Sequence, residues 1–156
     1  MEKLRTAQIG RAGELLVQFR LLQLGYDSSL LTTDRGIDLV AYSPSNDTVR
    51  TIQVKSVAGE KPSGGTGKPT FDWWVPDDTP ATIVALVDIA GPNVWLLTLP
   101  EIQKFSKQHS KGRFHPYCYL GDDAPRGAPH VRELNQFALT RERVQALFTS
   151  DTLSPD

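Results

Sequence analysis

Hydrophobic residues recur at helical spacing near the start of the chain. Residues 4–24 place Ala12, Leu15, Phe19 and Leu22 at positions i, i+3, i+7 and i+10, along one side of a helix. The pattern predicts a long amphipathic helix, and the apolar side of such a helix ordinarily faces a core.

Three glycines bear on this predicted helix. Gly25 is well placed to end it in a left-handed conformation. Gly10 and Gly13 lie inside it, where each costs about 1 kcal/mol relative to alanine. Either another part of the molecule approaches the backbone closely at these glycines, or the helix begins at about Gly10.

Short segments with β-like patterns follow the helix. Ser45, Asn46 and Asp47 are typical turn residues between the segments 37–43 and 48–57, which we expect to pair as an antiparallel hairpin. The predicted strands are 29–33, 37–43, 48–57, 71–75, 82–89 and 94–99.

Two further helices are expected. Pro100 is tolerated in a first helical turn and opens a helix to about Gln108. Thr140 is a good N-cap for a final helix through Phe148. Helices interleaved with a mixed sheet predict an α/β or α+β layered domain.

Other stretches carry no clear periodic pattern. Residues 58–70 have the composition of a flexible loop, and we assign no regular element to 109–130, which is rich in Gly, Pro, His and Asp. The chain of 156 residues fits one domain, over 1–150, followed by a frayed tail at 151–156.

Composition sets broad limits on the function. The hydrophobic fraction of 39% is ordinary for a soluble globular protein, and the net charge of −1 favours no class of partner. No apolar run approaches the roughly 20 residues of a membrane span, and the first residues lack the apolar centre of a signal peptide. The lone Cys118 excludes an internal disulfide, and we expect a cytoplasmic protein.

The predicted hairpin gathers polar groups. Along its second strand, Ile52 and Val54 point to one face, while Gln53 and Lys55 point to the other. Asp38 opens the first strand, so it can lie beside them once the hairpin pairs. An acid, an amide oxygen and an ammonium group are thereby expected in a small volume.

This set of groups suits the hydrolysis of phosphodiester bonds. Mg²⁺ takes oxygen ligands, usually one or two carboxylates together with waters and a phosphate oxygen. The metal makes the attacking water more acidic and neutralises charge that develops on the phosphate. Lys55 can hold that water or bind a phosphate oxygen as a point charge.

At this point the residues resemble a known family. Glu14 in GRAGELL, Asp38 in RGIDLVAY, and Gln53 and Lys55 in IQVKS are similar in order and approximate spacing to the PD-(D/E)XK nuclease superfamily. The Holliday-junction-resolvase branch and certain homing endonucleases share this order. The resemblance covers about residues 8–57. It implies a single α/β domain with a restriction-endonuclease-like fold, in which helices flank a mixed central sheet.

The resemblance also implies a role for each residue. Asp38 matches the central metal ligand, Glu14 the helix-borne accessory ligand and Lys55 the catalytic lysine, with Mg²⁺ or Mn²⁺ as the cofactor. Two positions depart from the family pattern. Ile37 stands where a proline is usual, and Gln53 stands where the family has a second acid, so Glu14 would have to supply the second carboxylate.

The implied function is a metal-dependent endonuclease that hydrolyses DNA phosphodiester bonds. Its partner would be duplex or branched DNA. Because one site cuts one strand, a homodimer or higher homo-oligomer is expected. Two alternatives stay open: a catalytically inactive DNA-binding or assembly module of the same fold, or an unrelated α/β protein in which the motif is a coincidence.

Further residues have weaker signals. Lys61 and Lys68 can touch backbone phosphates from a mobile arm, or belong to a solvated linker. Trp73 and Trp74 alternate faces, so one is expected in the core and the other on an edge strand or stacked on a base. Arg141, Glu142 and Arg143 are expected on a solvated face. The set of His109, His115, Cys118 and His130 matches no standard zinc-ligand spacing.

Overall fold

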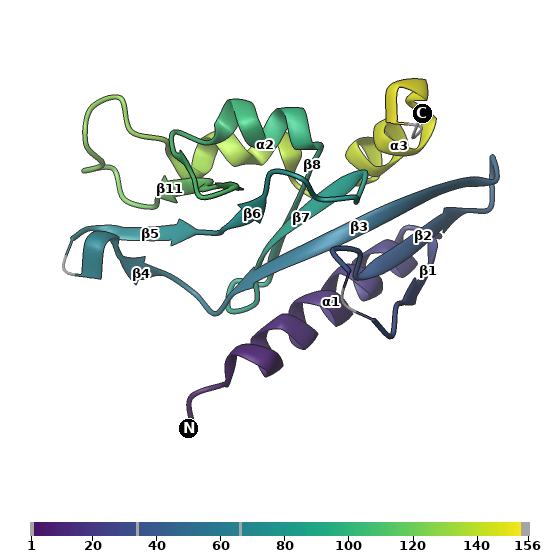
Figure 1. Ribbon diagram of the computed structural model, residues 1–156, viewed down its shortest axis with the longest axis horizontal. Coiled ribbons are helices and arrows are strands. Elements are labelled where there is room, and N and C mark those ends of the chain that lie inside the picture. Colours follow the sequence, from purple (N-terminus) through teal and green to yellow (C-terminus); the bar gives the residue numbers. More distant parts are fainter. Residues whose placement is uncertain (1, 34, 66, 154–156) are drawn as a thin grey trace.

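A central five-stranded sheet with helices on both faces forms the body of the molecule (Figure 1). The computed structural model describes residues 2–33, 35–65 and 67–153. The helices are α1 (Thr6–Gln23), α2 (Leu99–Phe105) and α3 (Arg141–Thr149), with 3-10 helices η1 (Ser63–Gly65), η2 (Val131–Phe137) and η3 (Asp151–Leu153). The strands are β1 (Asp27–Leu30), β2 (Leu39–Ser43), β3 (Thr48–Val57), β4 (Lys61–Pro62), β5 (Pro69–Asp72), β6 (Val75–Pro76), β7 (Ile83–Asp88), β8 (Asn93–Leu97), β9 (His109–Ser110), β10 (Arg113–Phe114) and β11 (Tyr117–Tyr119).

The central sheet has the strand order β1-β2-β3-β7-β8. All neighbours are antiparallel except β3 and β7, which run parallel. The predicted hairpin is confirmed as β2 and β3, and Asp47 in its turn has a positive φ of 58°. A mixed sheet flanked by helices confirms the predicted α/β class.

Two hydrophobic clusters cover the two faces of this sheet. Ile52, Ile83 and Ala85 point into the cluster that also holds side chains of α1 and α3. Val84 and Leu86 point the other way, toward α2, η2 and the smaller sheets. The alternation of side chains along β3 and β7 therefore builds both cores from adjacent residues.

The buried side of α1 differs from the predicted one. Leu15, Phe19 and Leu22 are 49%, 56% and 61% exposed, while Val17 and Leu21 are fully buried. The helix carries apolar residues on more than one side, so spacing alone does not show which side faces the sheet. The prediction of the helix was right, and the prediction of its buried face was wrong.

The glycines of α1 explain which side is buried. A Cβ built on Gly13 would lie 1.8 Å from Ser56 Oγ and 2.9 Å from Ser56 Cβ, whereas a Cβ on Gly10 would meet nothing within 4 Å. The expected close approach is thus confirmed at Gly13. The alternative, a helix that begins at about Gly10, is wrong because α1 begins at Thr6. Gly25 ends the helix with a φ of 87°, as predicted.

Two stretches predicted without regular structure contain short strands. Within 58–70 the structure has β4, η1 and the start of β5, with residue 66 outside the described part. Within 109–130 it has β9, β10 and β11, which join two three-stranded sheets, β6-β10-β9 and β11-β5-β4. Strands of two to four residues are too short to show a periodic pattern in the sequence.

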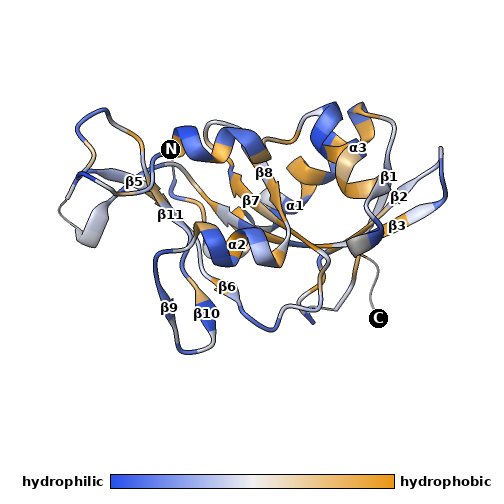
Figure 2. Ribbon diagram, turned by 90° about the horizontal axis from the view of Figure 1, so that it is seen from above, coloured by the Kyte–Doolittle hydropathy of each residue, from blue (hydrophilic) through white to orange (hydrophobic). Residues whose placement is uncertain are grey.

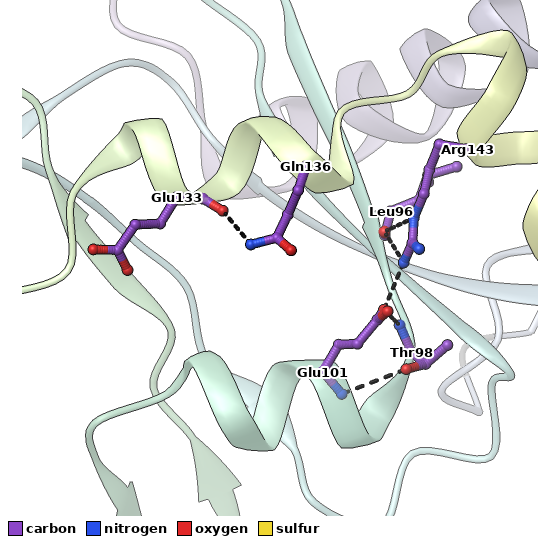
Figure 3. Close-up of polar contacts among 6 residues, drawn as sticks. All are labelled: Leu96, Thr98, Glu101, Glu133, Gln136 and Arg143. Atoms are coloured by element: carbon purple, nitrogen blue, oxygen red, sulfur yellow. Dashed lines mark hydrogen bonds and ion pairs between the residues drawn. The ribbon is translucent and has the colours of Figure 1, made fainter.

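At the start of α3, Arg141 and Glu142 are exposed as predicted, whereas Arg143 is tied to the sheet. Arg143 donates to the carbonyl oxygen of Leu96 through Nε at 3.1 Å and Nη2 at 3.0 Å, and Nη2 lies 2.5 Å from Glu101 Oε2 (Figure 3). Thr140 caps α3 as predicted, because its Oγ1 accepts from the Arg143 N–H at 3.2 Å. The expectation of a solvated face is therefore wrong for Arg143.

Past α3 the chain forms one more turn, η3, and residues 154–156 of the predicted frayed tail lie outside the described residues. Leu153 in that turn packs against the cluster that holds α1 and α3.

Of the helices in the described ranges, none combines the length and apolarity needed to cross a bilayer.

Candidate active site

The central strand β3 changes neighbours halfway along its length. β2 pairs with Thr48–Ile52, and β7 pairs with Ile52–Val57 on the opposite edge. Among the described residues, no strand continues β2 beside the second half of β3. Backbone donors and acceptors on that edge must therefore find other partners.

Asp38 occupies this edge. Its N–H donates to the carbonyl oxygen of Ile52 at 2.9 Å, and its Oδ2 accepts from the Val54 N–H at 2.6 Å. The side chain thus replaces the strand neighbour that β2 no longer provides. As a result, the carboxylate lies against the backbone of β3 between the positions of Gln53 and Lys55.

Gln53 places an amide in an enclosed position. The residue is 4% exposed, and its Oε1 is buried without a hydrogen-bond donor among the described residues. Its Nε2 lies 3.7 Å from where a Cβ on Gly36 would stand. An unsatisfied buried polar atom costs about 1–3 kcal/mol, so this oxygen is suited to a partner from outside the chain.

Lys55 shares a face of β3 with Gln53, because the two residues are separated by one position. It pairs in register with Leu86 of β7 and is partly buried. Its ammonium forms no ion pair with a carboxylate in the part of the chain that the structure describes. The charge of Lys55 is therefore available to a group that enters the site.

Glu14 is held near β3 by the close packing of α1. Its neighbour Gly13 meets the side chains of Val54 and Ser56, so α1 lies on the face of β3 opposite to Gln53 and Lys55. The Glu14 carboxylate pairs with Arg11 at 2.8 Å and is 21% exposed. A meeting of Glu14 with Asp38 would take place at the edge of β3 that β2 leaves open, and it stays a prediction.

Comparison with known proteins adds to this geometry. No family model and no curated protein matches the sequence. The structure is similar to that of a bacterial homing endonuclease, I-Ssp6803I, with a TM-score of 0.64 over 96% of this chain and 98% of that one. The chain shares the fold of that endonuclease. The two sequences are 14% identical, so the likeness establishes the fold, and the chemistry must be argued from the residues.

The oxygen donors at the open edge of β3 fit a hard cation. Asp38 supplies a carboxylate, and Gln53 supplies a buried amide oxygen for which residues 2–33, 35–65 and 67–153 provide no donor. Both are ligand types that Mg²⁺ and Mn²⁺ accept. Within residues 2–33, 35–65 and 67–153, no three His, Cys, Asp or Glu side chains form a possible metal site. The predicted ligand set of Glu14, Asp38 and Gln53 has two acids and one amide, so it differs from a site built from three such side chains.

The predicted phosphate contacts lie elsewhere. Lys61 on β4 forms an ion pair with Asp72, and Lys68 donates to the carbonyl oxygen of Asp123. Both lysines are more than two-fifths exposed, and each has an acidic neighbour. Their contact with nucleic acid stays a prediction.

A polar network on the small sheets was not predicted from the sequence. Asp72 on β5 has its Oδ2 3.0 Å from His115 Nε2, and His115 Nδ1 lies 3.0 Å from Gln108 Oε1. His115 also stacks on Trp74, with ring centroids 3.9 Å apart and planes at 2°. Asp72 and His115 are 43 positions apart in the chain, so no local motif could have indicated their contact.

The residues considered as zinc ligands have separate roles. His109 pairs with Asp77 at 2.7 Å, and His130 accepts from the Arg132 N–H at 3.1 Å. Burial raises the pKa of the Cys118 thiol to about 12, so the thiolate needed for zinc binding is disfavoured.

Proposed function

We propose that this chain is a metal-dependent endonuclease that hydrolyses DNA phosphodiester bonds, with Glu14, Asp38, Gln53 and Lys55 as its active site. The observation that supports it most is the hydrogen bond from Val54 to Asp38, which holds a carboxylate beside β3 between Gln53 and Lys55. The fold shared with a homing endonuclease supports DNA as the substrate. Because one site cuts one strand, we also propose that the enzyme acts as a homodimer or larger homo-oligomer.

Asp38 and Gln53 would hold Mg²⁺ or Mn²⁺ through a carboxylate oxygen and an amide oxygen. When bound, such a metal lowers the pKa of the attacking water and neutralises charge on the phosphate. The Val54 N–H fixes one oxygen of Asp38 and so limits rotation of the carboxylate. Enclosure of Gln53 keeps its oxygen in place in the same way.

Lys55 would act on the phosphate by charge. An ammonium group at this position attracts the phosphate diester and stabilises negative charge on its oxygens in the transition state. Glu14 would supply a second carboxylate from α1. In this structure Glu14 Oε2 pairs with Arg11 at 2.8 Å.

A nicking assay tests the proposed function directly. Supercoiled plasmid incubated with the chain and Mg²⁺ or Mn²⁺ is expected to become nicked or linear, and EDTA is expected to stop the reaction. Lys55→Ala should reduce the rate by at least about a hundredfold, since it removes a charge that acts in the transition state. Four-way-junction and linear duplex substrates run in parallel identify the preferred DNA. Cleavage that persists in Lys55→Ala would contradict the assigned site.

A binding module without turnover is the second candidate, and Gln53 is the observation that favours it. An amide ligand contributes no negative charge, so the metal is held less firmly than by two acids. If the natural chain nicks DNA, Gln53→Glu is expected to lower the Mg²⁺ concentration needed for half-maximal nicking. If the natural chain is a binding module, the variant is expected to bind Mg²⁺ more tightly and to gain nicking. The same variant should be less stable than wild type in EDTA, because it buries a second carboxylate near Asp38.

Nicking by the wild-type chain separates the two candidates, and the Gln53→Glu variant shows whether the missing charge is the reason for low or absent activity. Thermal melting with and without Mg²⁺ measures metal affinity independently of cleavage. If Gln53→Glu binds metal more strongly and nicks faster than the wild type, or nicks where the wild type does not, the missing charge limits the activity of the natural chain. If neither metal affinity nor nicking increases, loss of charge at this ligand is not what limits activity.

A further inference from the structure

A basic stretch lies outside the proposed active site. Residues 102–121 contain four basic residues and no acidic residue, within a chain whose net charge is −1. The four are Lys104, Lys107, Lys111 and Arg113. The last two lie on the hairpin of β9 and β10, which projects from the body of the molecule with a hydrophilic tip (Figure 2).

The tip of this hairpin has a defined conformation. Lys111 and Gly112 have φ angles of 52° and 73°, the pattern of a type I′ turn, whose twist matches that of paired strands. Lys111 stands at the turn and is exposed. At the base, Phe114 pairs with Val75 of β6 and is buried in the core. The hairpin is therefore a firmly anchored ribbon that presents a cation at its end.

Arg113 is positioned by an aromatic side chain. Its guanidinium lies 5.2 Å from the ring centroid of Trp74, which in turn stacks on His115. Both Arg113 and Trp74 are exposed. A guanidinium held over an aromatic ring loses less entropy when it binds a phosphate or the edge of a guanine.

A short series of contacts links the hairpin tip to Gln53. Gly112 accepts from the Asp77 N–H at 2.9 Å, and Asp77 also pairs with His109. Three residues later, Pro80 packs against Gly36, where an added Cβ would lie 2.9 Å from Pro80 Cδ. Three residues span at most about 10 Å. Because Gly36 adjoins Gln53, DNA at the active site would reach the hairpin.

We propose that the β9–β10 hairpin enters the major groove of substrate DNA beside the cut phosphate, with Lys111 and Arg113 as contacts. The major groove is about 12 Å wide and admits a two-stranded β-ribbon. The charge of the stretch complements the DNA backbone, and Arg113 has the geometry to bind a base edge or a phosphate through two donors. This assignment rests on the proposed nuclease function and adds a recognition surface to it.

The test measures binding without cleavage. Fluorescence anisotropy with a labelled DNA duplex in EDTA compares the wild-type chain with Lys111→Asn and Arg113→Lys. Asparagine tolerates the positive φ at the turn, so Lys111→Asn removes the charge and keeps the hairpin. It is expected to weaken binding about fivefold to tenfold and to reduce the salt slope by about one. Arg113→Lys keeps the charge but loses the planar fork, and a weakening of about fivefold is expected.

Controls separate the hairpin from other sources of affinity. Arg141→Gln removes an exposed basic residue of α3 and should change the affinity by less than about twofold. Methyl green, which occupies the major groove, should compete with the chain, whereas the minor-groove ligand netropsin should not. Competition by netropsin alone would overturn the groove assignment.

Failure of the hairpin proposal can be told apart from failure of the nuclease proposal. If the wild type nicks plasmid and both hairpin variants bind as it does, the hairpin proposal is overturned and the nuclease proposal stands. If the wild type neither binds duplex DNA nor nicks it, both are overturned. Thermal melting of each variant confirms that it is folded.

Discussion

Replacing Asp38 by asparagine is expected to slow metal-dependent DNA cleavage sharply while the fold stays intact. The amide oxygen of asparagine can still accept the Val54 N–H, so the contact at the open edge of β3 is kept. The negative charge that holds the metal is lost. A metal contributes several kcal/mol of charge stabilisation, and each 1.36 kcal/mol is tenfold in rate, so nicking should slow by about a thousandfold. Initial rates of plasmid nicking at saturating Mg²⁺ measure the effect.

Asp27→Asn is the matched control for this experiment. Asp27 is an exposed aspartate at the start of β1, and it undergoes the same chemical change. Its nicking rate should equal that of the wild type. Melting temperatures of both variants should also be close to the wild-type value. If Asp38→Asn nicked at the wild-type rate, the cleavage would come from another site, and the assignment of Asp38 as the metal ligand would be wrong.

The sequence predicted the elements whose side chains alternate over many positions. The bounds of β3, Thr48–Val57, are those predicted, because polar and apolar residues alternate from Thr51 to Lys55 and turn residues precede the strand. The hairpin with β2 followed from its turn residues. By contrast, β9 and β10 have two residues each, and their pairing depends on the turn at Lys111 and on β6, which is distant in the chain.

The candidate site could be predicted only in part. Period-two spacing correctly places Gln53 and Lys55 on one face of β3. The position of Asp38 depends on where β2 begins, because its side chain bonds to the backbone of Val54 only where β3 has no strand neighbour on that edge. The first residue of β2 is a property of the sheet register, and no local pattern encodes it. Likewise, the sequence did not show that α1 would approach β3 from the face opposite to Gln53.

The orientation of α1 has a sequence signal that hydrophobicity does not carry. Leu15, Phe19 and Leu22 are as apolar as the buried Val17 and Leu21, so pattern alone permits either side to face the sheet. A glycine within a helix costs stability unless the backbone needs the space. Gly13 therefore marks the contact face, whereas Gly10, where an added Cβ would meet nothing within 4 Å, does not.

Adding one methyl group at Gly13 is expected to destabilise the protein, while the same change at Gly10 is expected to stabilise it. A Cβ on Gly13 would overlap Ser56 Oγ at 1.8 Å and Ser56 Cβ at 2.9 Å. Rotation of the hydroxyl relieves the first overlap, but the second requires α1 to move away from β3. Overpacking of this kind costs about 1–3 kcal/mol, against a gain of up to about 1 kcal/mol in helix propensity. Urea denaturation of both variants measures the difference.

The comparison also tests how the packing of α1 supports the site. A Cβ added at Gly10 would meet nothing within 4 Å. Gly10→Ala should therefore raise the free energy of unfolding by about 0.5–1 kcal/mol and keep the wild-type nicking rate. Gly13→Ala displaces the helix that carries Glu14. Its nicking rate should therefore fall even at urea concentrations too low to unfold the variant. Adding Ser56→Gly removes both overlapping atoms, and the double variant should be more stable than the sum of the single changes predicts. Equal stability of Gly10→Ala and Gly13→Ala would show that α1 does not rest on Ser56 as the structure has it.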